Sequence, residues 1–129
     1  MANKYGIVIL SHSESLAVGL KALLDEVAHD VAITTAGSTF DGRIGTSYEK
    51  IQEAIDSNPY DELLVFYDLG SAKMNLEIVL DNTSKKIHVM DCALVEGAYV
   101  AAAMLGAEQS LEAVMAELKP LMIKALSDL

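Results

Sequence analysis

The sequence predicts an α/β domain with an open, mostly parallel sheet of four strands and helices on both faces. Short, continuous apolar runs, typical of strands covered on both faces, alternate with segments of helical periodicity in the order βαβαβαβαα. The chain has 129 residues, of which 52% are hydrophobic, and it contains no internal repeat or linker. We therefore expect one domain over residues 1–129.

The first apolar run predicts a strand over residues 5–10, and a second strand follows over residues 31–35. Between them, Ser11 and Glu14 match the S-x-x-E capping box, which predicts a helix that begins at Ser11 and has His12 in its first turn. Five apolar residues at helical spacing predict that this helix lays one stripe on the sheet: Leu16, Leu20, Leu23, Leu24 and Val27.

A glycine-rich stretch over residues 36–46 is long for a connection in such a domain, which favours a functional loop. Thr46 and Glu49 form a second capping box, and the helix that they open extends to about residue 56. The third strand covers residues 63–67. The helix after it is indicated by three apolar residues, Met74, Ile78 and Val79.

Residues 87–90 form the predicted fourth strand, and an apolar, alanine-rich helix begins near Leu94. A helix that is apolar almost all round is typical of a buried helix or of one that packs on another subunit. The last helix is predicted over residues 111–126, with a kink at Pro120.

Composition excludes several classes of partner. The net charge is −10, and no basic run concentrates the nine Lys and Arg residues, which argues against binding to nucleic acid or anionic membranes. No apolar run reaches the roughly 18 residues that a membrane span needs. The single cysteine, Cys92, lies in an apolar setting and is interpreted as a buried, inert thiol. We expect a cytoplasmic protein whose partners are proteins or small molecules.

Candidate chemistry lies where two apolar strands end. His12 follows the first strand and Asp68 the third, and parallel strands bring such residues to one edge of the sheet. A carboxylate that accepts a proton from one imidazole nitrogen leaves the other nucleophilic. Backbone amides near Ser13, Gly37, Gly70 and Ser71 are the predicted phosphate-binding groups. The pattern predicts a phosphohistidine site.

Taken singly, these residues also have structural interpretations. A histidine at a helix start can be a polar surface cap, Asp68 can cap the following turn, and the glycines can serve turn geometry alone. His29 and His88 are interpreted as structural. The sequence has neither G-x-x-x-x-G-K-[ST] nor G-x-G-x-x-G, and no Cys or His cluster has zinc spacing. We therefore predict no cofactor and no metal for this chain.

Five ordered motifs resemble a known family over essentially the whole chain: Val8-Ile9-Leu10-Ser11-His12-Ser13, Ala36-Gly37-Ser38-Thr39, Gly42-Arg43-Ile44-Gly45-Thr46-Ser47, Asp68-Leu69-Gly70-Ser71-Ala72 and Leu94-Val95-Glu96-Gly97-Ala98. They are similar to the DhaM phosphotransfer subunits of phosphoenolpyruvate-dependent dihydroxyacetone kinases, which are related to the mannose-class IIA domains of the sugar phosphotransferase system.

The resemblance implies that His12 accepts a phosphoryl group from phospho-HPr and passes it to ADP held by a nucleotide-binding subunit, DhaL. ATP regenerated there would phosphorylate dihydroxyacetone on a third subunit, DhaK. The resemblance also implies that Asp68 is the partner of His12 and that the protein is a homodimer, for which the apolar helix over residues 95–105 offers a surface.

Ser38 and Phe40 depart from the family pattern, because many relatives have Gly and Asp there. Some relatives carry fused HPr and enzyme I-like domains, whereas this chain is expected to use a separate phospho-HPr. Two alternatives stay open: a mannose-type IIA subunit of a sugar permease and a phosphorylation-dependent regulatory binding module. The motifs that begin at Asp68 and at Leu94 favour the kinase subunit.

Overall fold

The computed structural model of the protein describes residues 4–124 and contains one parallel four-stranded sheet. The strands are β1 (Tyr5–Ser11), β2 (Ile33–Gly37), β3 (Glu62–Tyr67) and β4 (Lys86–Met90), in the order β2-β1-β3-β4. The helices are α1 (Glu14–Val27), α2 (Tyr48–Ser57), α3 (Ser71–Leu80), α4 (Leu94–Gly106), α5 (Leu111–Leu118) and the short 3₁₀ helix η1 (Lys119–Leu121). The predicted fold class is confirmed.

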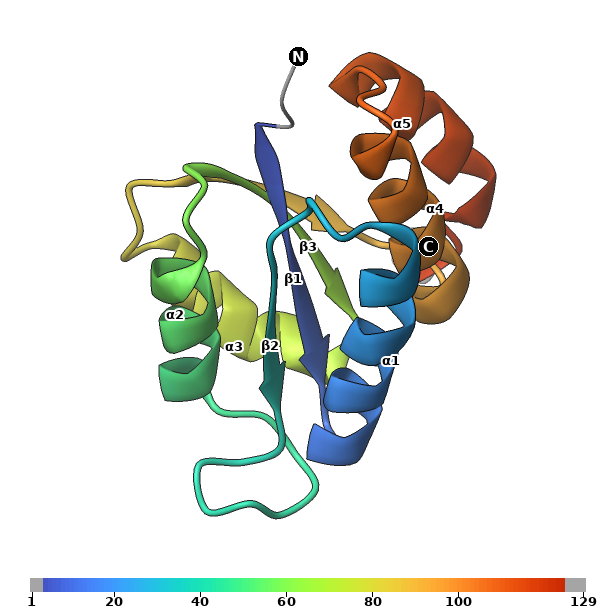
Figure 1. Cartoon of the computed structure of the whole chain (residues 1–129). Helices are drawn as coiled ribbons and strands as arrows, with labels where there is room; N and C mark the ends of the chain where they lie inside the picture. Colours follow the sequence, from blue (N-terminus) through green and yellow to red (C-terminus); the bar gives the residue numbers. More distant parts are fainter. Residues whose placement is uncertain (1–3, 125–129) are drawn as a thin grey trace.

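The sheet separates two apolar layers. Helices α1, α4 and α5 lie on one face, and α2 and α3 lie on the other (Figure 1). Along β1, Ile7 and Ile9 face the first layer, whereas Val8 and Leu10 face the second, and all four are fully buried. This burial is why the central strands consist of continuous apolar runs instead of alternating residues.

The predicted start of the first helix is wrong by two residues. Ser11 is the buried last residue of β1, and the Ser13 hydroxyl caps α1 by accepting a hydrogen bond from the amide of Leu16. His12 therefore lies in the connection before α1, not in its first turn. Ser11 still belongs to the extended strand, and its hydroxyl donates to Asp68 and accepts from the Ser13 amide instead of capping a helix.

Two neighbouring boundaries shift in the same way. Ser47 rather than Thr46 caps α2, because the Thr46 hydroxyl accepts a hydrogen bond from Asn75 of α3. The second strand is β2, two residues later than residues 31–35, since its register with β1 runs from Ile33 to Gly37. Tertiary partners thus decide between equivalent local signals.

The apolar stripes of α1 and α3 are wider than their contacts with the sheet. Helix α1 buries Ala17, Leu20 and Leu24, so the prediction that the whole stripe covers the sheet is wrong. Three of its members are at least 39% exposed: Leu16, Leu23 and Val27. Helix α3 likewise exposes Met74 and Ile78, two of the three residues that indicated it, and buries a face that includes alanine. An alanine on the buried face lets the helix axis approach the sheet closely.

The last helix ends earlier than predicted. Helix α5 stops at Leu118, and Pro120 belongs to η1 instead of kinking a continuous helix. Proline has no amide proton to donate to the preceding turn, so the α-helical pattern ends there. The predicted residues 125–126 lie outside the described residues.

In residues 4–124, no helix has the length and hydropathy needed to cross a bilayer.

One buried side-chain amide joins β1 to the neighbouring edge strand β2 near the amino end of the sheet. Asn58 is 1% exposed, and its Nδ2 donates to the carbonyls of Ile7 and Ala32, each at 3.2 Å, and lies 3.3 Å from Thr34 Oγ1. Its side chain fills the space that Gly6 leaves free, because a Cβ at position 6 would lie 2.2 Å from Asn58 Oδ1.

Replacement of Gly6 by alanine is expected to destabilise the fold by about 2 kcal/mol or more, because Asn58 must move and leave buried polar groups without partners. Urea unfolding measures the change. The control is Gly19→Ala on the exposed side of α1, where nothing lies within 4 Å of an added Cβ. That variant should gain about 0.5–1 kcal/mol. Equal effects of the two substitutions would contradict the role given to Asn58.

Candidate functional site

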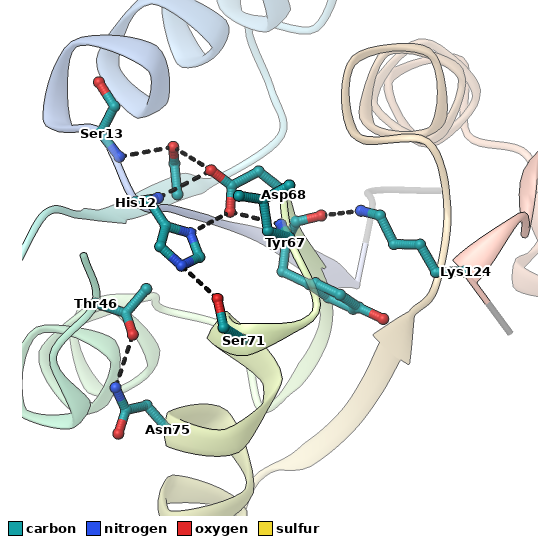
Figure 2. A network of polar contacts seen from close by, with 10 residues as sticks. His12, Ser13, Thr46, Tyr67, Asp68, Ser71, Asn75 and Lys124 are labelled. Carbon is teal, nitrogen blue, oxygen red and sulfur yellow. Dashed lines mark hydrogen bonds and ion pairs between the residues drawn. The ribbon is translucent and has the colours of Figure 1, made fainter. Parts of the chain in front are cut away.

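The Asp68 carboxylate organises the carboxyl edge of the sheet. Its Oδ2 accepts hydrogen bonds from the Ser11 hydroxyl at 2.8 Å and from the His12 amide at 2.9 Å. Its Oδ1 accepts from the Leu69 amide at 2.7 Å and lies 2.9 Å from His12 Nδ1 (Figure 2). One side chain thus binds the end of β1, the histidine ring and the connection to α3.

The His12 imidazole is held at both of its nitrogen atoms. A carboxylate can only accept, so Nδ1 carries the proton and donates to Asp68. Nε2 is then unprotonated, and its lone pair accepts a hydrogen bond from the Ser71 hydroxyl at 2.7 Å. The His12 side chain is 17% exposed. Figure 2 shows the ring between Asp68 and Ser71, with Nε2 toward α3.

The glycine-rich loop supports the backbone of His12. The Gly45 amide donates to the His12 carbonyl at 2.9 Å, and the Ser38 amide donates to the Ser11 carbonyl at 3.2 Å. Ser38 is buried and has a φ of 71°, a left-handed conformation that favours glycine. A glycine, which the family resemblance implies at this position, would adopt this conformation without strain. Phe40, the second departure, is 75% exposed.

The predicted phosphate-binding residues fall into two groups. Ser71 is the first residue of α3 and Gly70 is its N-cap, so their amides lie at a helix N-terminus beside His12 Nε2. The contacts of Ser13 and Gly37 are within the fold. The Ser13 amide donates to the Ser11 hydroxyl, and the Gly37 carbonyl accepts from Lys50 Nζ at 2.7 Å.

Gly37 has a steric role in addition to its position at the edge. A Cβ there would lie 2.6 Å from the Cα of Glu14, so only glycine lets the start of α1 rest on the end of β2. The fold thereby brings the start of α1, and His12 before it, against the sheet edge where Asp68 lies.

The protonation state of Asp68 follows from two opposing effects on its pKa. Burial acts to raise the pKa of its carboxyl group, but the hydrogen bonds from the amide and ring of His12, from Ser11 and from Leu69 outweigh burial and hold the pKa below its ordinary value. Asp68 is therefore ionised at neutral pH. A neutral imidazole oriented by a carboxylate is a nucleophile at its outer nitrogen, Nε2.

Sequence reasoning missed two groups at the site. Ser11 was assigned to a helix cap, yet the pairing of Leu10 with Tyr67 already places Ser11 next to Asp68. Asn75, one turn after Ser71 on α3, donates to Thr46 Oγ1 at 2.7 Å and ties the loop to that helix. The i, i+4 spacing from Ser71 is the signal that indicates it.

The other histidines lie apart from this site. His88 Nε2 is 2.6 Å from Glu62 Oε2, a pair between the middle of β4 and the start of β3. His29 is exposed in the turn after α1. Among residues 4–124, no group of three or more His, Cys, Asp or Glu side chains could hold a metal ion.

Comparison with known proteins identifies relatives of the chain. Residues 6–115 match the family model described as PTS system fructose IIA component, EIIA-man. The chain is 48% identical to "PEP-dependent dihydroxyacetone kinase 1, phosphoryl donor subunit DhaM" of Listeria innocua, over 96% of this chain and 100% of that protein. It is 45% identical to "PTS-dependent dihydroxyacetone kinase, phosphotransferase subunit DhaM" of Lactococcus lactis, over 93% of this chain and 98% of the relative.

A solved structure has the same fold. A crystal structure of a protein of unknown function superposes with a TM-score of 0.81 and 29% sequence identity, over 92% of this chain and 95% of the other. The agreement extends over the sheet and its helices.

The lowered pKa of Asp68 predicts a specific dependence of stability on pH. A carboxyl group whose pKa is lower in the folded state stabilises the fold above its unfolded pKa, and this contribution is lost as the pH falls through the folded pKa. We expect the wild-type protein to be more stable than Asp68→Asn at pH 7. The difference should shrink as the pH falls from about 5 to about 3.

Urea unfolding of both proteins at several pH values measures this difference. A difference between wild type and Asp68→Asn that is constant or grows toward pH 3 would contradict the assignment.

Proposed function

The chain belongs to the DhaM phosphoryl donor subunits of dihydroxyacetone kinase, within the IIA components of the phosphotransferase system, and on that premise we propose that it is a phosphohistidine carrier. In this proposal, His12 accepts a phosphoryl group from phospho-HPr and transfers it to ADP bound on DhaL. DhaK takes part indirectly, as the subunit on which the regenerated ATP phosphorylates dihydroxyacetone.

The observation that carries the proposal is the orientation of the His12 ring, with Nδ1 on Asp68 and Nε2 beside Ser71 at the start of α3. In the loading step, the Nε2 lone pair forms a bond to phosphorus while the bond from phosphorus to the donor imidazole breaks. The electron pair of that bond returns to the donor ring. The proton on Nδ1 remains shared with Asp68, whose charge offsets the positive charge on the phosphorylated ring.

In the unloading step, an oxygen of the ADP β-phosphate attacks phosphorus, and the bond to Nε2 breaks with its electrons returning to the His12 ring. The Ser71 hydroxyl and the amides of Gly70 and Ser71 are the groups that would stabilise the transferring oxygens. These groups bind an anion without a lysine or arginine, which suits a chain with a net charge of −10.

Exposed apolar side chains beside the site support protein partners. Phe40 and Ile44 in the glycine-rich loop are 75% and 77% exposed, and Leu69, next to Asp68, is 59% exposed. Such side chains around a reacting group favour docking of a protein surface over binding of a small molecule. In this proposal the relay operates in the cytoplasm. The free, buried thiol of Cys92 is compatible with the reducing conditions of that compartment.

Incubation with phosphoenolpyruvate, enzyme I and HPr is expected to add one phosphoryl group to the protein, because Nε2 of His12 carries an unprotonated lone pair beside the start of α3. Intact mass and peptide mapping under alkaline conditions locate the group. The substitution His12→Gln should abolish it, whereas His88→Gln and His29→Gln should not. Labelling that survives in His12→Gln would contradict the proposal.

The unloading step separates this function from its two alternatives. Addition of ADP and DhaL should remove the label from His12 and produce ATP. A sugar permease subunit would instead lose its label to a permease component, and a regulatory module would keep it and change only in binding.

We also propose that the protein is a homodimer that associates through α4. The inner side of this helix, which includes Ala98 and Ala101, is buried in the protomer, but Val95 and Tyr99 are 47% and 40% exposed. Sedimentation velocity should give the mass of a dimer, and Tyr99→Lys should shift it toward the monomer, since a buried charge opposes association. Glu108→Lys, after α4, is the control. A monomer at micromolar concentration would contradict the proposal.

A further inference from the structure

The segment that follows α5 brings Lys124 close to the end of β3, which carries Asp68 of the histidine site. The Leu121 carbonyl accepts a hydrogen bond from the Ala93 amide at 2.9 Å, and the Lys124 amide donates to the Asp91 carbonyl at 3.0 Å. These bonds hold residues 121–124 against the chain that leaves β4. Lys124 therefore reaches the carboxyl end of β3 from the other end of the sequence.

The Lys124 side chain binds the peptide unit that carries Asp68. Its Nζ donates to the Tyr67 carbonyl and lies 4.3 Å from the centroid of the Tyr67 ring (Figure 2). Tyr67 still pairs with Leu10 of β1, but the ladder between β3 and β4 ends one residue earlier, at the pair of Phe66 and Met90. Lys124 supplies a side-chain hydrogen bond to the Tyr67 carbonyl at this point.

The same peptide unit is fixed from its other side. The Asp68 amide donates to the Leu10 carbonyl of β1 at 3.2 Å. The Tyr67 ring is also fixed, because its hydroxyl donates to Asp91, which accepts from Lys73 Nζ at 3.0 Å as well. The backbone that positions the Asp68 carboxylate is thus bound at both ends, and one of the two bonds comes from Lys124.

We propose that Lys124 is a positioning residue for phosphoryl transfer at His12, which acts by holding the Tyr67–Asp68 peptide unit in place. The inference rests on the proposed carrier function of His12. A shift of Asp68 would move the imidazole that it orients, and displacements of about 1 Å reduce the rates of group transfer about 100-fold.

Charge supports the same role. Burial lowers the pKa of Lys124, while the nearby Asp68, Cys92 and Asp91 act to raise it. An ammonium group close to Asp68 favours the ionised carboxylate that the His12 ring needs as its partner. The attraction between Lys124 and Asp68 therefore accompanies the hydrogen bond that holds the Tyr67–Asp68 peptide unit.

The test compares Lys124→Met, which keeps the length of the side chain and removes its donor, with Lys124→Arg, which keeps the donor and the charge. In the full chain, Lys124→Met should lower the rate constant of phosphorylation at saturating phospho-HPr about tenfold, with little change in KM. Lys124→Arg should recover it to within about threefold. The matched control is Lys119→Met, in the same segment but exposed, which should leave the rate unchanged.

A second readout does not depend on any partner. In NMR spectra, the Nδ1–H proton and the ring nitrogens of His12 should shift in Lys124→Met, return toward wild type in Lys124→Arg and stay unchanged in Lys119→Met. If His12 takes up no phosphoryl group in any variant, the carrier function fails, but these resonances still decide whether Lys124 positions the ring.

Unshifted His12 resonances in Lys124→Met, or equal losses of rate in Lys124→Met and Lys119→Met, would overturn the proposal. If Lys124→Met does not fold, Lys124→Gln takes its place, since it retains a neutral donor. The His12 resonances of Lys124→Gln should then differ from those of wild type. Unshifted His12 resonances in this variant would overturn the proposal in the same way.

Discussion

The carboxylate of Asp68 is the constraint on which the site depends. It accepts four hydrogen bonds, which come from the last residue of β1, from the amide and ring of His12 and from the amide that leads into α3. Each donor comes from the end of a strand or the connection after it. Burial of an ionised carboxyl group is costly without such partners. The Asp68 carboxylate is therefore stable in its ionised form only while these donors keep their positions.

The rest of the fold keeps those partners in place. Gly37 lets the start of α1 approach β2, and the Gly45 amide holds the carbonyl of His12. Asn58 joins β1 to β2 at the opposite end, and Gly6 leaves the room for it. Three of these four positions are glycines. At Gly6 and Gly37 a Cβ would lie too close to the Asn58 side chain and to the backbone of Glu14, and Gly45 has a positive φ of 147°.

An acidic chain that handles a phosphoryl group needs positive potential without a cluster of basic residues. The start of α3 offers backbone amides and the positive end of a helix dipole beside His12 Nε2. The lysines near the site have other contacts: Lys50 binds the Gly37 carbonyl, Lys73 binds Asp91 and Lys124 binds the Tyr67 carbonyl. These contacts stabilise the framework around the histidine.

The sequence by itself determined the fold class, the order of its elements and the meeting of His12 with Asp68, because buried parallel strands have a distinctive apolar pattern and place their ends at one edge. It did not determine which serine caps α1, which face of α1 is buried or where the last helix ends. Ser11 and Ser13 are equivalent as local signals, and only the carboxylate of a distant residue selects between them. The same holds for Lys124, whose contact with Tyr67 spans 57 residues of sequence and exists only because the tertiary structure holds residues 121–124 against the chain that follows β4.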